Sequence, residues 1–118
     1  MSGRSDPVAF VADMVQAAGR ILAFTSGLSD PDVLDPEGPT RAAVLHLLVV
    51  IGEAAKHVPD DIRSRDPDLP WAAFAGLRDK VVHYYFGLSD AAIIGAVRGE
   101  LPSDLARLRA LLADLEAD

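Results

Sequence analysis

Apolar side chains recur at intervals of three and four residues along most of the chain, and this spacing restricts the possible folds more than any other feature. It places apolar residues on one side of an α-helix. Segment 7–25 carries two such stripes: Val8, Val11, Val15, Ala18 and Leu22, and then Phe10, Met14, Ala17, Ile21 and Phe24. No stretch alternates polar and apolar residues as a half-buried strand does. The sequence therefore predicts an all-α protein. Two apolar sides on one helix of a small domain also predict a partner subunit.

Capping and breaking residues give the bounds of the first helix. Ser5-Asp6-Pro7 combines capping side chains with a proline at the first helical position. We expect this helix to run to about Thr25, with Gly27 as its stop. The segment 27–39 contains three prolines and is predicted to be a loop.

The remaining chain divides in the same way. We expect further helices over about 40–58, over 71–85, from Ser89-Asp90 onward, and through the leucine-rich segment 105–115. A polar connector with one turn around Ile62 fills residues 60–70. Pro102 has no N–H to donate, so it must kink or split the last helix. The prediction is a single domain, residues 1–118, folded as an up-and-down bundle of four to five helices.

Composition and the lengths of apolar runs indicate the cellular location of the protein. There is no cysteine, so we expect no disulfide framework and no thiolate chemistry. The longest apolar run, Val44 to Ile51, is interrupted by His46 and is far shorter than the roughly 20 residues that span a bilayer. Residues 1–8 lack the basic-then-apolar order of a signal peptide. We expect a cytoplasmic protein with no membrane partner.

The net charge of −7 argues against a protein that binds long nucleic-acid tracts, because such proteins are usually basic. The charge is uneven, since residues 53–83 contain six acidic and five basic side chains. A nearly neutral region favours a brief contact with one phosphodiester. We expect no DNA partner, and the acidic remainder leaves room for a basic protein partner.

The segment from Leu77 to Phe86 contains the strongest candidate site. Arg78 can hold a phosphate through paired N–H donors, and His83 titrates near neutrality and can move a proton. Together they suffice to cut a phosphodiester without a metal. On a helix, the core stripe would be Phe74, Leu77, Val81, Tyr85 and Leu88. Asp79 and His83 share roughly the opposite side, so His83 faces solvent or a cleft made with a second copy.

Several of these residues have a second interpretation. Arg78 and His83 could be ordinary surface residues, and Asp79 either orients the imidazole or forms a plain helix-surface pair. Glu53, with His46 and His57, could bind a metal, but no matching motif lies elsewhere, so we expect no metal and no cofactor. Glu53 is then a supporting residue beside the helix of Arg78, and Gly52 permits close helix packing.

Two aromatic residues at the start of the same helix also have two interpretations. Trp71 and Phe74 could stack on bases or anchor the helix in the core. We favour the core.

The order Arg-x4-His-x-Tyr, formed by Arg78, His83 and Tyr85 with a polar residue directly after the arginine, resembles the signature of the HEPN superfamily. Within it, the chain resembles the HepT-like ribonucleases of toxin–antitoxin pairs. Three further segments resemble that family's motifs in order and spacing, so that the agreement covers nearly the whole chain: Ile51-Gly52-Glu53-Ala54-Ala55, Asp68-Leu69-Pro70-Trp71 and Gly76-Leu77-Arg78-Asp79.

The resemblance implies a toxin that cuts RNA, either mRNA or tRNA, as a metal-independent endo- or exoribonuclease. Arg78 would hold the phosphate and His83 would act as general base or acid, with two protomers of a homodimer sharing one cleft. It also implies an MNT-type nucleotidyltransferase antitoxin that transfers AMP to Tyr85. From the residues alone, Tyr85 is either a buried phenol or a solvent-reaching one near the helix end, and Tyr84 lies beside it.

A rival interpretation belongs to another functional class. The chain would then be a non-catalytic HEPN-type helical module that only docks onto a nucleotidyltransferase.

Overall fold

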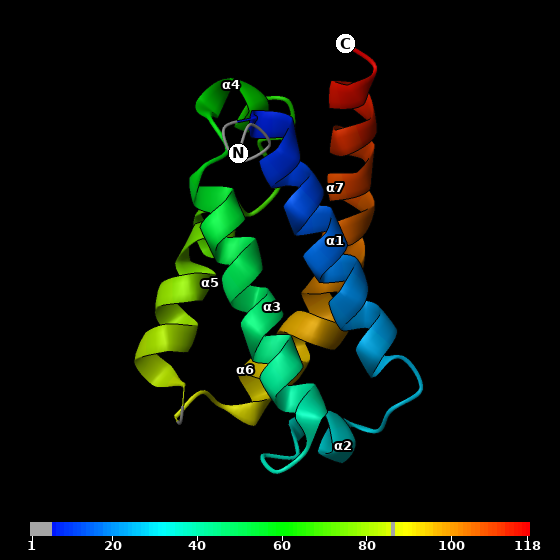
Figure 1. The fold of residues 1–118 in the computed structure, drawn as a ribbon, viewed down its shortest axis with the longest axis vertical. Coiled ribbons are helices and arrows are strands. Elements are labelled where there is room, and N and C mark those ends of the chain that lie inside the picture. Colours follow the sequence, from blue (N-terminus) through cyan, green and yellow to red (C-terminus); the bar gives the residue numbers. More distant parts are fainter. Residues whose placement is uncertain (1–5, 86) are drawn as a thin grey trace.

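The computed structural model describes residues 6–85 and 87–118, and every regular element in these ranges is helical. The predicted all-α bundle is confirmed (Figure 1). Its long helices are α1 (Pro7–Thr25), α3 (Pro39–Lys56), α5 (Trp71–Tyr84) and α7 (Leu101–Glu116). The shorter elements are α2 (Asp30–Leu34), α4 (Asp60–Arg63), α6 (Asp90–Ile94) and the π-helical segment η2 (Gly95–Glu100).

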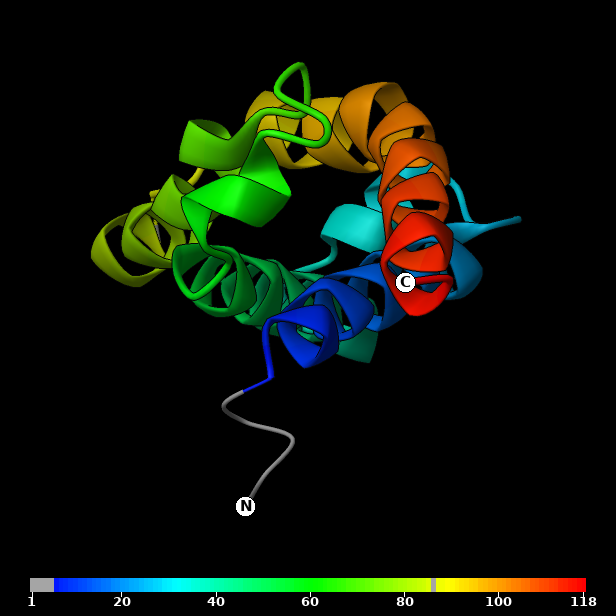
Figure 2. The ribbon, with the colours of Figure 1, turned by 90° about the horizontal axis from the view of Figure 1, so that it is seen from above.

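The long helices run alternately down and up, and α3 lies between α5 and α1 (Figure 1). Helix α1 also packs against α7. Seen along the bundle, α5 and α7 lie at opposite sides (Figure 2). One connected core runs through these helices, and its largest fully buried side chains include Met14, Ile21, Leu45, Ile51, Ile93 and Leu108.

Helix α1 is buried on two sides within a single protomer. Val11 and Ala18 from one stripe, and Met14 and Ile21 from the other, are all fully buried. Because α3 and α7 both pack against α1, the second stripe needs no partner subunit to cover it, and that argument for a dimer was wrong. Phe10 at the start of the second stripe is partly exposed, and Phe24 near its end is 42% exposed.

The ends of α1 follow from its capping residues. The side chain of Asp6 accepts a hydrogen bond from the Val8 N–H at 2.9 Å, and Pro7 occupies the first turn. At the other end, Gly27 has a φ of 80°, a value that residues with a Cβ avoid. These predicted bounds are confirmed; Ser5, proposed with Asp6 as part of the start, lies outside the described residues.

The connection between α1 and α3 contains a helix that the sequence interpretation did not predict. Helix α2 begins after Ser29, whose hydroxyl accepts a hydrogen bond from the Asp32 N–H at 3.3 Å. Pro31 lies in the first turn of α2, where a helix needs no N–H donor. Reading Pro31 only as a breaker was therefore wrong. The single turn expected around Ile62 is confirmed as α4.

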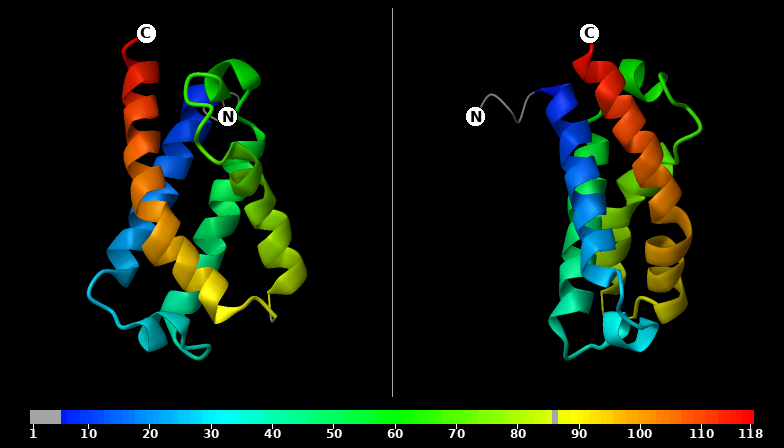
Figure 3. Two further views of the ribbon diagram at one scale, coloured as in Figure 1. Left: turned by 180° about the vertical axis from the view of Figure 1, so that it is seen from behind. Right: turned by 90° about the vertical axis from the view of Figure 1, so that its right-hand side faces the viewer.

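The chain between α6 and α7 is continuous but irregular. Pro102 cannot donate to the carbonyl four residues earlier, and the six residues before Leu101 form the π-helical segment η2. The Leu101 N–H bonds to the Ala96 carbonyl, five residues back. The predicted kink near Pro102 thus takes the form of a local π-helix, and α6, η2 and α7 form one bent run (Figure 3).

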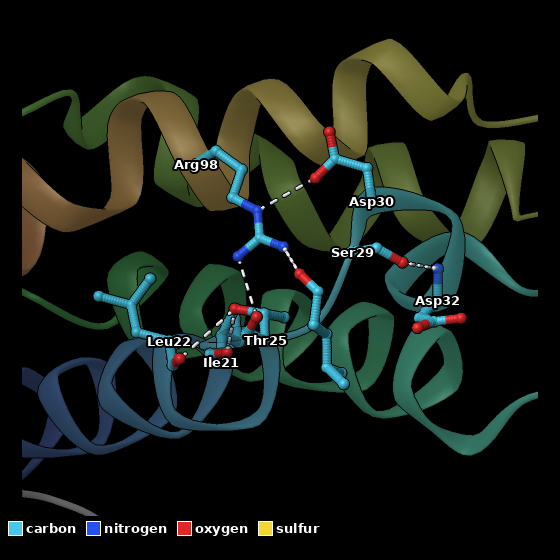
Figure 4. Close-up of polar contacts among 8 residues, drawn as sticks. Ile21, Leu22, Thr25, Ser29, Asp30, Asp32 and Arg98 are labelled. Carbon is cyan, nitrogen blue, oxygen red and sulfur yellow. Dashed lines mark hydrogen bonds and ion pairs between the residues drawn. The ribbon is translucent and has the colours of Figure 1, made fainter.

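Two arginines hold α6 and η2 against neighbouring segments, at the end of the bundle opposite α4. Arg98 of η2 donates to the carbonyls of Thr25 and Leu28 at 2.9 and 2.7 Å and pairs with Asp30 at 3.3 Å (Figure 4). The Thr25 carbonyl is at the C-terminus of α1, where carbonyls lack helical partners, and the Leu28 carbonyl is in the loop that follows, so Arg98 holds the end of α1 and this loop together.

Arg41 of α3 makes a similar set of contacts. It donates to the Leu34 and Leu88 carbonyls at 3.2 and 3.5 Å and pairs with Asp90 at 3.1 Å. These contacts join α2, α3 and α6.

Within the described residues, α1 is the one helix long and apolar enough to cross a membrane, judged by length and composition alone. Core helices of folded domains meet the same criterion, and Val11, Met14 and Ile21 of α1 lie in the core.

Candidate active site

The candidate site is built where α3 and α5 come closest, at Gly52. A Cβ at this position would lie 2.6 Å from the backbone nitrogen of Arg78 and 3.0 Å from the Phe74 carbonyl oxygen. Real side chains do not tolerate such distances, so glycine is needed for this approach. The predicted packing role of Gly52 is confirmed. It brings the next residue, Glu53, beside Arg78.

The N-terminal part of α5 is fixed in the core by two aromatic residues. Trp71 and Phe74 are buried and meet edge to face with their centroids 6.1 Å apart. The indole N–H of Trp71 donates to the Asp66 carbonyl at 2.9 Å. Both residues are anchors, as favoured from the sequence, and neither is available to stack on a base.

Four charged side chains form a network over this helix contact. Arg78 Nε lies 3.1 Å from Glu53 Oε1, and Arg78 Nη1 lies 3.2 Å from Asp79 Oδ1. Lys56 Nζ lies 3.3 Å from the same Asp79 oxygen and 3.9 Å from Glu53 Oε1. All four side chains are between 35% and 53% exposed. The network pairs two cations with two carboxylates.

Asp79 is the partner of these cations and not of His83. Hydrogen bonds from Arg78 and then Lys56 lower the pKa of the Asp79 carboxyl below its usual value. Asp79 and His83 share no hydrogen bond or ion pair. Asp79 was expected either to orient the imidazole or to form a helix-surface pair, and the structure shows ion pairing because both cations attract the carboxylate.

The three residues at the end of α5 are exposed. His83 is exposed, and the exposures of Tyr84 and Tyr85 are 62% and 42%. The expected core stripe includes buried Phe74 and Val81 but stops before Tyr85, because α5 diverges from α3 toward its C-terminal end (Figure 1). The alternative of a buried Tyr85 phenol is therefore wrong.

The solvent-facing position expected for His83 is confirmed, and no hydrogen bond or ion pair within the described residues restrains its imidazole. Phe86, the last residue of the candidate segment, lies outside the described residues.

Arg78 and His83 project in different directions from α5. Five residues separate them, which is roughly 140° around a helix and about 7.5 Å along it. Arg78 nevertheless reaches toward Asp79, whose position on the helix lies between the two. The guanidinium thus reaches toward the Asp79 carboxylate, which is one helical turn from His83.

The three candidate metal ligands do not converge. In the part of the chain that the structure describes, no group of three or more His, Asp or Glu side chains is arranged to hold a metal. The ring of His57 stacks on Phe10 with centroids 4.9 Å apart. His57 and Glu53 line an open groove of about 410 Å³ with apolar neighbours, among them Val49 and Val50. His57 therefore has an aromatic partner, and the metal interpretation has no geometric support.

Comparison with known proteins identifies the family. The family described as "Ribonuclease HepT-like" matches residues 14–111. A protein of Methanocaldococcus jannaschii, provisionally named an RNase, is 33% identical over 115 residues, which are 98% of this chain and 94% of that protein. The "Probable ribonuclease HepT" of Thermococcus cleftensis is 34% identical over 94 residues, which are 80% of this chain and 84% of that protein.

The chain belongs to the HepT-like ribonuclease family. Its helical bundle agrees with the HEPN-type fold that the sequence motifs predicted. The family match includes Glu53, Arg78, His83 and Tyr85. No solved structure matches the chain.

One member of the charged network was not identified from the sequence. Lys56 contacts both Glu53 and Asp79. Its position three residues after Glu53 places the two on the same side of a helix, and this spacing could have identified it. The contact between Lys56 and Asp79 depends on how α3 and α5 pack, which no local spacing reveals.

Proposed function

We propose that this chain is the toxin of a toxin–antitoxin pair and that it cuts RNA in the cytoplasm without a metal, using Arg78 and His83. The observation that carries the proposal is the exposed His83, one helical turn from the Asp79 carboxylate that Arg78 holds, in a chain of a ribonuclease family. An exposed imidazole beside a phosphate-binding guanidinium suits acid–base cleavage of a phosphodiester.

In the proposed reaction, the ribose 2′-oxygen attacks the neighbouring phosphorus and the bond to the 5′-oxygen of the next nucleotide breaks. His83 removes the proton of the 2′-hydroxyl or donates a proton to the leaving 5′-oxygen. Arg78 holds the phosphate and stabilises the charge that gathers on it. Glu53 supports the reaction by orienting the guanidinium through the contact at 3.1 Å, and Asp79 positions it through the contact at 3.2 Å before substrate binds.

We propose that the active form is a homodimer. Val82 and Tyr84 leave large apolar surface exposed on both sides of His83, at 54% and 62%. Exposed apolar patches often mark interfaces, and a two-fold axis near this turn would bring two sets of Arg78 and His83 into one cleft. Light scattering at micromolar concentration should give the dimer mass, and a clean monomer would remove the shared cleft.

The catalytic proposal is tested by incubating purified protein with RNA in the presence of a chelator. The wild type should cut, and His83→Ala should lose at least about 100-fold in rate, the low end for an acid–base group. His46→Ala is the matched control, because His46 is also exposed but lies on α3. Intact RNA with the wild type, at high protein and low salt, would favour a non-catalytic module that docks onto a nucleotidyltransferase.

We further propose that an MNT-type nucleotidyltransferase antitoxin neutralises this toxin by transferring AMP to Tyr85. The exposure of Tyr85 at the end of α5 supports access by an enzyme. An AMP group would bring a negative charge and a bulky nucleoside near Arg78, which would exclude RNA by charge and by size.

Co-expression with the cognate nucleotidyltransferase should add one or more AMP units to Tyr85 and abolish cleavage, as followed by intact mass and peptide mapping. Tyr85→Phe should escape modification and keep at least partial activity, and Tyr84→Phe is the control. A label on Tyr84 would contradict the assignment. Loss of cleavage without any AMP label would indicate that the bound antitoxin masks the site and does not modify it.

A further inference from the structure

Two cations from different helices hold one oxygen of Asp79. Lys56, the last residue of α3, lies 3.3 Å from Oδ1, and Arg78 of α5 lies 3.2 Å from the same atom. Ammonium and guanidinium groups that converge on one anionic oxygen form the arrangement by which proteins hold phosphates. In this structure the anion between the two cations is the carboxylate of Asp79.

We propose that Lys56 and Arg78 form a two-cation site for an RNA phosphodiester, and that Asp79 occupies this site in the substrate-free protomer. The inference rests on the proposed ribonuclease function and adds Lys56 as a substrate-binding residue. Asp79 is then an internal competitor that the substrate phosphate displaces.

The position of this site relative to His83 fits the reaction. Asp79 and His83 are four residues apart on α5, so their Cβ atoms are neighbours at about 5–6 Å. A phosphate that takes the place of the Asp79 carboxylate lies within reach of the imidazole. Arg78 alone would not define this place, because Glu53 also binds its Nε. The place is defined by Lys56 and Arg78 meeting at the same Asp79 oxygen.

The exchange is also electrostatically feasible. A phosphodiester and the Asp79 carboxylate each carry one negative charge, so the cations keep an anionic partner throughout. The Asp79 side chain is 53% exposed and can turn to water when it is displaced. Because its pKa is lowered by the two cations, Asp79 remains ionised at neutral pH and competes under working conditions.

The chain offers a matched control in Lys80, which is next to Asp79 in sequence. Lys80 is exposed on α5 and forms no ion pair or hydrogen bond with the described residues. Removing its charge changes the net charge as much as removing that of Lys56. A specific site and a general loss of positive charge therefore give different results for the two lysines.

The test measures binding of a fluorescent single-stranded RNA to protein carrying His83→Ala, so that cleavage does not interfere. Adding Lys56→Met should weaken binding at least about fivefold and reduce the slope of log affinity against log salt by about 0.7, the value for one phosphate contact on a single strand. Lys80→Met should change affinity less than about twofold. Lys56→Arg should restore binding, and Asp79→Asn should tighten it at least about threefold by removing the competitor.

Equal effects of Lys56→Met and Lys80→Met, or weaker binding with Asp79→Asn, would overturn the proposal. Undetectable RNA binding by the parent His83→Ala protein at low salt would overturn it as well. Melting curves of each variant separate a binding defect from misfolding. Binding is measured without turnover, so the two proposals can fail separately. The two-cation site can be disproved while the wild type still cuts RNA. It can also be supported when the wild type binds RNA without cutting it.

Discussion

Arg41 and Arg98 are bonded in a different way from Arg78. Arg98 donates to two backbone carbonyls and one carboxylate, and Arg41 does the same with a side chain only 16% exposed (Figure 4 shows Arg98). Arg78 is 45% exposed, and its ion pairs within the described residues are with two carboxylate side chains, Glu53 and Asp79.

This difference separates arginines that hold the fold from one that can bind a substrate. A backbone carbonyl cannot move away without distorting the helix end or loop that carries it. An exposed carboxylate can rotate into water at little cost. We infer that Arg41 and Arg98 are permanently occupied, whereas Arg78 can exchange its partners for a phosphate.

The largest effect should come from Gly52, because the backbone beneath the exchangeable network of Arg78 is closely packed. Gly52→Val would place a Cβ 2.6 Å from the Arg78 nitrogen and force α3 and α5 apart. We expect a loss of about 3 kcal/mol in unfolding free energy, the upper part of the usual range for overpacking, measured by urea denaturation. Gly76→Val on α5 is a control for valine in a helix, since a Cβ there meets no neighbour within 4 Å. Equal losses in both variants would show that the close contact is not the cause.

The contrast between Arg98 and Arg78 predicts a stability difference of intermediate size. Arg98→Met leaves the Thr25 and Leu28 carbonyls without this donor and should cost about 1–3 kcal/mol. Arg78→Met removes only exposed ion pairs and should change stability by less than about 1 kcal/mol. Thermal and urea unfolding of the two variants provide the measurement. A larger loss for Arg78→Met would reverse the assignment.

The smallest expected effect is on stability at acidic pH, because it depends on the exposed Asp79. Its pKa is lower in the folded than in the unfolded chain because of Arg78 and Lys56. The stability that Asp79 contributes is therefore present above its unfolded pKa and is lost as pH falls through the folded pKa. Asp79→Asn should lose less stability than the wild type over that acidic window, as followed by unfolding at a series of pH values. Parallel curves would mean that the pairing has no net effect.

The sequence predicted those parts of the fold that local signals determine. Asp6-Pro7 and Gly27 gave the ends of α1, and the helical spacing of apolar residues gave the all-α class. Helix α2 was missed because Pro31 breaks helices at most positions but not in a first turn. The need for a partner on α1 was inferred wrongly, because periodicity shows that a side is buried but not which helix covers it.

The candidate site shows the same limit. Spacing along α5 correctly predicted that His83 faces solvent, and the interpretation of Glu53 as a residue beside the helix of Arg78 agrees with their ion pair. The pairing of Lys56 with Asp79 joins residues 23 apart and depends on the approach of two helices at Gly52. The exposure of Tyr85 depends on the divergence of α5 from α3, which cannot be predicted from helix periodicity.

The central claim is that Arg78 binds substrate while Arg98 holds the fold, and one paired measurement tests it directly. RNA cleavage in chelator is compared for Arg78→Lys and Arg98→Lys, each corrected for the folded fraction. Lysine keeps the charge but loses the planar fork, so Arg78→Lys should lose at least about tenfold, or roughly 1.4 kcal/mol of transition-state stabilisation. Arg98→Lys should cut within about twofold of the wild type. Wild-type cleavage by Arg78→Lys, or an equal loss in Arg98→Lys, would contradict the account.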